Sequence, residues 1–179
     1  MRVVAGIHKG RRLAAPKGRS TRPTADSVRE SIFNLLGPVA GARVLDLYAG
    51  TGAVGLEALS RGAAHVTFVE SDRTAAAAVQ RNVEAVGLPG TTVAATTVES
   101  YLAGRPDAPF DLAYVDPPYA LDEATLGAVL AALSGRLAPG AVVVVERSAR
   151  GVEPSWPDVI ESVKQKRYGE GLLWYGRRR

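Results

Sequence analysis

The chain of 179 residues contains no cysteine, only two histidines and a single methionine. The lack of cysteine excludes disulfides, thiolate zinc sites, iron–sulfur clusters and a thiol nucleophile. Because His8 and His65 are the only imidazoles, we also expect no metal site. No stretch approaches the roughly 18 consecutive apolar residues of a membrane span, and charged residues stand where a signal peptide would be apolar. We therefore expect a cytoplasmic protein without membrane contact.

The net charge of +4 conceals an uneven distribution of charge along the chain. Residues 1–30 carry eight basic and two acidic residues, and residues 164–179 carry six basic and one acidic residue. This leaves eight basic and 15 acidic residues in between. Arginine supplies 18 of the 22 cations, and its guanidinium binds phosphates and stacks on bases. Nucleic acid is therefore the favoured partner, with simply solvated ends as the alternative.

The N-terminal region reads as a small appendage to a larger domain. Two short β-compatible runs, 3–7 and 11–15, surround a Lys-Gly pair and predict a hairpin. After a Pro/Gly-rich loop, an amphipathic helix is expected from about residue 24 to a Gly-Pro stop after residue 36. We assign 1–23 to a basic hairpin arm for RNA recognition and 24–179 to the main domain.

From residue 43 onward, short β-branched runs alternate with Ala/Leu-rich stretches of helical length. The expected strands are 43–47, 65–69, 91–95, 111–115 and 141–146, and the expected helices are 53–61, 73–86, about 98–103, and 122–134. Such alternation predicts an α/β fold with a doubly wound, mostly parallel sheet. The last two runs, 159–166 and 172–175, flank a glycine-rich turn and predict an antiparallel hairpin at the sheet edge.

A glycine-rich turn between the first expected strand and helix carries the first candidate site. Gly50, Gly52 and Gly55 have GxGxxG spacing, and Glu70 lies 20 positions after Gly50, at the end of the second strand. This context favours a nucleoside site over a purely structural turn. Asp46 would repel the pyrophosphate of NAD but attract the ammonium and sulfonium of S-adenosylmethionine. We therefore predict S-adenosylmethionine as the cofactor, with Glu70 accepting hydrogen bonds from its ribose.

The fourth expected strand ends in Asp116-Pro117-Pro118-Tyr119, where the carboxyl ends of parallel strands form a ligand crevice. An aspartate and a backbone carbonyl can accept the two hydrogens of a planar exocyclic amine and stabilise the charge that develops during its methylation. Pro117 would fix that carbonyl, and Tyr119 would stack on an unstacked base. A rigid turn with a capping aspartate is the alternative interpretation.

These motifs carry a resemblance to a known family. The run 45–52 resembles the first motif of class I S-adenosylmethionine-dependent methyltransferases, and 116–119 resembles their amino-methylating signature. The runs 6–13 and 21–34 are more specific and resemble the RsmD family, bacterial 16S rRNA (guanine-N2)-methyltransferases that act on guanine 966 of the small-subunit rRNA. The resemblance covers essentially the whole chain.

The resemblance implies a Rossmann-like sheet of seven strands in the order 3-2-1-4-5-7-6 and methylation of guanine 966 within the small ribosomal subunit or its assembly intermediate. It places the cofactor on Asp46, Tyr48, Gly50, Gly52 and Glu70, and the guanine on Asp116, Pro117 and Tyr119. The motif after the third strand departs from the common pattern, and we expect the backbone of Val98 to contact the adenine.

For the RNA itself, we expect contacts from Lys9, Arg11, Arg12 and Arg22. We also expect the protein to be a monomer.

Two other functions stay open at this point. One is amino-group methylation of another nucleic acid, such as adenine-N6 methylation of DNA; the other is a non-catalytic RNA-binding assembly factor that keeps the fold. The lack of cysteine disfavours C5-pyrimidine methylation, which ordinarily needs a thiol nucleophile.

Overall fold

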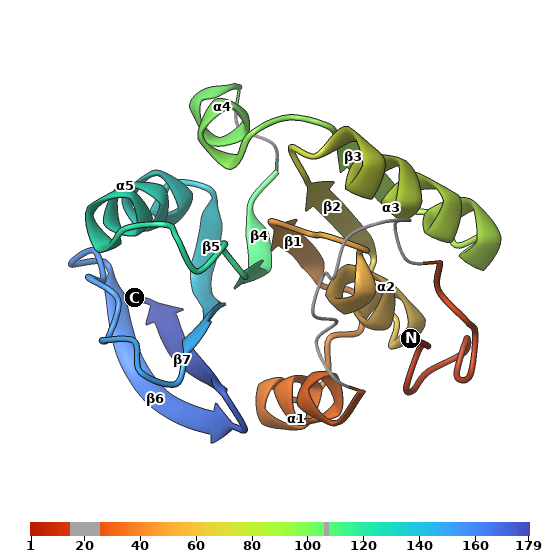
Figure 1. The fold of residues 1–179 in the computed structure, drawn as a ribbon, viewed down its shortest axis with the longest axis horizontal. Coiled ribbons are helices and arrows are strands. Elements are labelled where there is room, and N and C mark those ends of the chain that lie inside the picture. The colour runs from red at the N-terminus through yellow and green to blue at the C-terminus, as the bar shows by residue number, and fades with distance from the viewer. Residues whose placement is uncertain (15–25, 106–107) are drawn as a thin grey trace.

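The computed structural model describes residues 1–14, 26–105 and 108–179. In these residues one seven-stranded sheet has the order β3-β2-β1-β4-β5-β7-β6 (Figure 1). The strands are β1 (Arg43–Leu47), β2 (His65–Val69), β3 (Thr91–Ala94), β4 (Phe110–Val115), β5 (Leu137–Ser148), β6 (Ile160–Tyr168) and β7 (Gly171–Arg178). The helices are α1 (Asp26–Leu36), α2 (Ala53–Ser60), α3 (Arg73–Val86), α4 (Val98–Ala103) and α5 (Glu123–Ser134). The expected doubly wound α/β fold and its strand order are confirmed.

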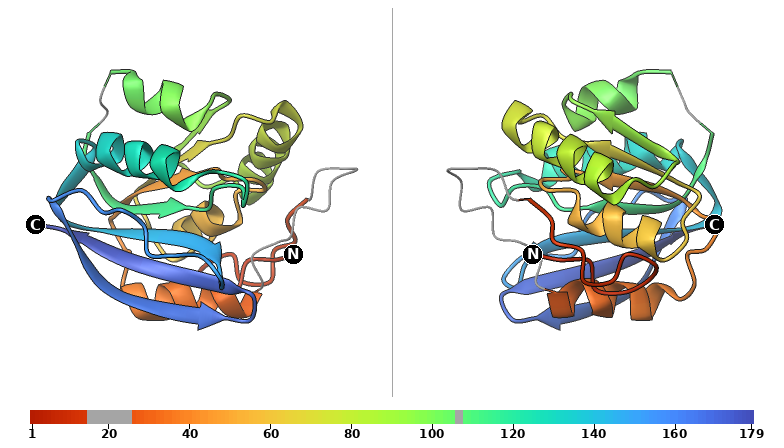
Figure 2. Two further views of the ribbon diagram at one scale, coloured as in Figure 1. Left: turned by 60° about the vertical axis from the view of Figure 1, so that its left-hand side comes forward. Right: turned by 90° about the vertical axis from the view of Figure 1, so that its right-hand side faces the viewer.

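The sheet is parallel from β3 to β5, whereas β7 pairs antiparallel with both β5 and β6. The central strands are buried on both faces, which is why they appear in the sequence as nearly continuous apolar runs. One apolar cluster joins α1, α2 and α3 to one face of the sheet, and a second joins α4 and α5 to the other. The helices thus cover both faces of the sheet (Figure 1, Figure 2).

One strand is much longer than the sequence predicts. β5 begins at Leu137 rather than near residue 141, because Leu137 already pairs with Phe110 of β4. The pairing register shifts between Phe110 and Leu112, and Gly140 has a φ of +79°, so the strand passes through Pro139-Gly140 as an irregular bulge. Pro-Gly normally indicates a turn, which is why the sequence predicts too late a start for this strand.

The first 14 residues lie against α2 and α3 rather than projecting from the domain. Within residues 1–14, the expected hairpin forms no regular strands; its one isolated antiparallel bridge joins Arg12 to Arg2, the residue just before the first expected run. Buried Glu57 of α2 accepts the backbone N–H groups of Val4 and Ala5 at 2.7 and 2.9 Å. This segment is therefore fixed by backbone hydrogen bonds. The expected boundary between residues 23 and 24 falls outside the described residues.

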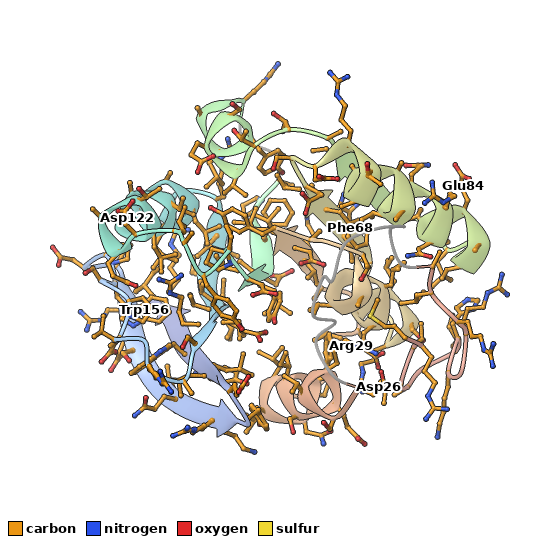
Figure 3. All side chains as sticks on the ribbon, viewed as in Figure 1. Asp26, Arg29, Phe68, Glu84, Asp122 and Trp156 are labelled. Carbon is orange, nitrogen blue, oxygen red and sulfur yellow. The ribbon has the colours of Figure 1, made fainter. Side chains whose placement is uncertain are left out.

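The close approach of this segment to α2 depends on a glycine. Gly6 has a φ of +80°, and a Cβ there would lie 1.8 Å from the carbonyl oxygen of Ser60. The backbone N–H of Ile7 donates to the same carbonyl at 2.9 Å. A further anchor lies on α1, where buried Arg29 binds the carbonyl of Arg2 and the carboxylate of Asp26 (Figure 3).

Among the described residues, no helix is both long and apolar enough to cross a membrane.

Candidate active site

A cleft of about 850 Å³ opens at the carboxyl ends of the parallel strands. The glycine loop after β1, the Asp-Pro-Pro-Tyr loop after β4 and the end of β5 line it. The loop after β2 also lines it. Further walls come from α1 and from the turn between β6 and β7, which lie near each other in space although far apart in sequence (Figure 1). This edge of a doubly wound sheet is where ligands bind in such folds.

The glycine loop is held by two carboxylates. Asp46 is buried, and its Oδ2 accepts the backbone N–H of Gly55, near the start of α2, at 2.9 Å. Glu70 accepts the backbone N–H of Gly50 at 2.8 Å through Oε2 and that of Asp72 at 2.7 Å through Oε1. Glu70 and the glycine loop, which the sequence predicts to belong to one site, are therefore in direct contact.

Conformation explains the small residues of this loop. Gly50 and Gly52 have φ values of +57° and +75°, a region that residues with a Cβ rarely adopt. A Cβ at Gly55 would lie 2.3 Å from the ring of Phe68, so this glycine lets α2 pack on β2. Tyr48 also has a positive φ, +59°, although it is not glycine. Its hydroxyl is buried without a hydrogen-bond partner among the described residues, and burial together with Glu99 raises its pKa to about 12.

Three carboxyl groups converge on the cleft, and each has a raised pKa. Burial raises the pKa of Asp46 to about 7, with the Gly55 hydrogen bond opposing the shift and Glu70 adding to it. Burial first, then the charges of Glu146 and Asp46, raise the pKa of Asp116 well above its usual range. Burial also raises the pKa of Glu146, against the hydrogen bond from Tyr114. The cleft therefore holds closely spaced, desolvated carboxyl groups that a positively charged or hydrogen-donating ligand would stabilise.

The Asp-Pro-Pro-Tyr loop presents an unpaired carboxylate beside an exposed ring. Asp116 accepts no hydrogen bond from any side chain or backbone group that the structure describes, although its carboxylate lines the cleft. Pro117 is buried, whereas the side chain of Tyr119 is 60% exposed at the rim. The loop closes through a hydrogen bond from Leu121 N–H to the Pro118 carbonyl at 2.9 Å. Such a pairing of acceptor and stacking surface suits a planar base.

The other predicted site residues lie in different surroundings. Gly52 shapes the loop but does not line the cleft. Val98 is the first residue of α4 and its side chain is buried in the core, outside the cleft lining. Lys9, Arg11 and Arg12 are exposed on the N-terminal segment, where the Arg11 guanidinium donates to the Ala85 carbonyl near the end of α3. Arg22 falls outside the described residues. Among those residues no cluster of His, Asp or Glu could hold a metal.

Several residues that line the cleft are not predicted from the sequence. Glu146 is the clearest case: it stands near the end of β5, directly after a run of four valines of which the last three are buried. A charged residue at the carboxyl end of an expected parallel strand is a signal that could have identified it. Others, such as Val28 of α1 and Tyr168 at the end of β6, give no such local signal.

Comparisons with known proteins agree with this geometry. A family model described as Conserved hypothetical protein 95 matches residues 1–177. The chain is 38% identical to ribosomal RNA small subunit methyltransferase D of Escherichia coli over 160 residues, 88% of this chain and 79% of that protein. The chain belongs to the RsmD family.

Two further relatives support this family assignment. A putative rRNA methyltransferase of Bacillus subtilis, YlbH, is 46% identical over 123 residues, which are 66% of this chain and 67% of that protein. Among solved structures, the putative methyltransferase yhhF from Escherichia coli superposes with a TM-score of 0.89 at 31% identity, covering 99% of this chain and 97% of that one. The RsmD resemblance of the sequence motifs is thus confirmed over essentially the whole chain.

Proposed function

We propose that this protein uses S-adenosylmethionine to methylate the exocyclic N2 amino group of a guanine, guanine 966, in 16S rRNA of the small ribosomal subunit. The observation that carries the proposal is the carboxylate of Asp116 at the end of β4, which accepts no hydrogen bond within the described part of the chain and lines the same cleft as the exposed ring of Tyr119 and the glycine loop. The relatives named as rRNA methyltransferases supply the RNA class, and the RsmD resemblance supplies the nucleotide.

Charge favours this cofactor over a dinucleotide. Among the described residues, the cleft lining contains six carboxyl side chains and no lysine or arginine: Asp46, Glu70, Asp72, Asp116, Glu146 and Glu170. A pyrophosphate would find no cation there, whereas an ammonium and a sulfonium would each reduce the desolvation cost of these carboxylates. Asp46 is placed to hold the ammonium, and Glu70 the ribose hydroxyls. When bound, S-adenosylmethionine supplies an electrophilic methyl group.

The remaining chemistry belongs to the chain. Tyr119 would stack on the extruded base, and Asp116 would accept a hydrogen from its amino group. As the nitrogen–carbon bond forms and the sulfur–carbon bond breaks, positive charge develops on the nitrogen, and the nearby Asp116 carboxylate stabilises it. The carboxylate can then take the proton that the methylated amine must lose. No metal and no covalent enzyme intermediate are needed.

RNA capture is assigned to the N-terminal segment. The acidic cleft repels phosphates, so a separate cationic surface is needed, and Lys9, Arg11 and Arg12 supply one on residues 1–14, with Arg22 further along the chain. We expect the protein to act as a monomer in the cytoplasm, where its substrate is assembled.

The decisive experiment is tritium transfer from labelled S-adenosylmethionine to small ribosomal subunits that lack modifications, followed by nucleoside digestion and mass analysis. We expect N2-methylguanosine at one position. N6-methyladenosine would instead support the second enzymatic function. Binding of the cofactor without any transfer would support a non-catalytic assembly factor.

Asp116→Ala separates catalysis from cofactor binding in this assay. We expect turnover to fall by about a hundredfold or more, the usual scale for losing one charge-stabilising group, while cofactor affinity stays within several-fold. Asp158→Asn, at an exposed residue in the loop before β6, is the matched control and should behave like the parent protein. Abolished cofactor binding with unchanged turnover per bound cofactor would make Asp116 a cofactor ligand instead.

A further inference from the structure

A second carboxylate, Glu146, lies beside Asp116 and has no role in the function proposed above. Val115 of β4 pairs with Val145 of β5 in parallel register, so Asp116 and Glu146 follow at adjacent strand positions and face the same side of the sheet. Both line the cleft. Neighbouring parallel strands lie about 4.8 Å apart, so the two carboxyl groups can reach adjacent atoms of one planar ligand.

The Glu146 side chain is held in one orientation with one oxygen left over. The Tyr114 hydroxyl, two residues before Asp116, donates to its Oε2. Its Oε1 accepts no hydrogen bond from the residues that the structure describes. Gly171 of the β6–β7 hairpin lies behind this oxygen, since a Cβ there would sit 3.3 Å from Oε1. Glu146 thus presents an oriented oxygen in the cleft that no group of the described residues donates to.

Two adjacent acceptors match one nucleobase better than the others. Guanine carries two neighbouring donors on its Watson–Crick edge, the amino group on C2 and the N1–H group. Adenine and cytosine place a ring-nitrogen acceptor beside their amino group, so a carboxylate facing that nitrogen would find no donor and would repel its lone pair. A site built around a hydrogen bond rejects an analogue that cannot form it, because the site's own polar group is then left unpaired.

We propose that Glu146 selects guanine by accepting the N1–H group while Asp116 engages the amino group. This inference rests on the proposed function and assigns base selection to a residue separate from the one that supports methyl transfer. It distinguishes guanine-N2 methylation from adenine-N6 methylation on structural grounds, since both reactions would use the same Asp-Pro-Pro-Tyr loop.

The test compares target RNA carrying guanine with the same RNA carrying 2-aminopurine at the methylated position. 2-Aminopurine keeps the C2 amino group but has a bare acceptor at N1 and no oxygen on C6, so the N1–H contact is lost together with any contact to that oxygen. The change in preference between the parent protein and Glu146→Gln therefore isolates the Glu146 contact. For the parent protein, we expect kcat/KM to favour guanine by about 10- to 150-fold, the range for one hydrogen bond to a charged group. In Glu146→Gln, whose amide can also donate, the preference should shrink to a few-fold, mostly through a loss on guanine.

The controls separate selection from structural damage. A merely structural role for Glu146 would lower kcat/KM on both RNAs equally and leave their ratio unchanged, which would overturn the inference. Glu84→Gln, at an exposed residue of α3 remote from the cleft, should keep the parent ratio (Figure 3). Failure of the parent protein to methylate the guanine RNA would instead refute the proposed function. If Glu146→Gln did not fold, Tyr114→Phe would free the carboxylate in place. An undiminished preference for guanine in that variant would also overturn the inference.

Discussion

The raised pKa of Asp46 predicts that cofactor affinity depends on pH in a defined direction. Burial raises this pKa from 3.8 to about 7, so the free protein binds a proton at Asp46 that the unfolded chain would have lost. The sign follows from linkage. The contribution of Asp46 to the free energy of unfolding is fully present below pH 3.8, the pKa of an unburied aspartate. It is lost as the pH rises through the folded-state pKa of about 7. Above that pH the free protein keeps a buried carboxylate at a cost of about 4 kcal/mol.

An ammonium group placed against Asp46 would offset this cost. Binding then requires the ionised carboxylate, and below pH 7 the cofactor must first displace a proton. With a pKa of about 7, the dissociation constant should be about eightfold higher at pH 6 than at pH 7.5, and about 0.8 proton should be released per cofactor near pH 6.5. The window stops at pH 7.5 because an α-amino group itself titrates at about 7.7–8.0.

Isothermal titration calorimetry in two buffers of different ionisation enthalpy measures both quantities. Asp46→Asn is the matched control, since its amide oxygen can still accept the Gly55 N–H group while the titrating proton is gone. Asp116 and Glu146 titrate in the same cleft, so the difference between parent and variant isolates Asp46. A flat affinity profile in the parent protein, or an equal pH dependence in the variant, would refute the assignment of the ammonium to Asp46.

Three further predictions concern the cofactor, the RNA and the anchor of the N-terminal segment. Glu70→Ala should raise the cofactor dissociation constant by about 10- to 150-fold by calorimetry, and an unchanged value in the folded variant would remove Glu70 from the site. Replacing Lys9, Arg11 and Arg12 together by alanine should flatten the slope of log RNA affinity against log salt by about two to three units, measured by fluorescence anisotropy, and leave cofactor affinity unchanged. If the variant kept the slope of the parent protein, the N-terminal segment would have a purely structural role. Gly6→Ala should lower the thermal midpoint more than Gly10→Ala, because both glycines have positive φ but only Gly6 lacks space for a Cβ. Equal losses would contradict the contact with Ser60.

The fold is predictable from the sequence where local pattern and burial agree. Parallel strands covered on both faces must be apolar throughout, so their runs stand out, and the residues after them must meet at one edge. This places Asp46, Glu70 and Asp116 around a common cleft before any coordinates are known. In the structure these three residues do line one cleft. The strand order, which the structure confirms, is implied by the family resemblance and not by this rule.

The remainder depends on contacts that no local pattern encodes. The turn after β6 joins the cleft only because β7 inserts between β5 and β6, which brings Gly171 against Glu146 of β5. Buried Glu57 is equally hidden, because a glutamate within a helix normally faces solvent, and its partners are backbone N–H groups more than 50 residues earlier. Contacts between residues far apart in the sequence therefore decide which acidic residues line the cleft and which, like Glu57, bind the backbone elsewhere.

One short helix, α2, contacts both the cationic N-terminal segment and the loop that lines the cleft. Near its start, α2 is tied to the cofactor loop through the Gly55 hydrogen bond to Asp46. Further along the same helix, Glu57 binds the backbone of residues 4 and 5 and also Arg61 at 2.8 Å. Every residue of α2 is buried, so the helix cannot tilt without disturbing the core. RNA bound by residues 9–12 would therefore be held at a fixed position relative to the cleft by the hydrogen bonds of α2. An acidic catalytic domain can in this way position a polyanion without a phosphate-binding cation inside its own cleft.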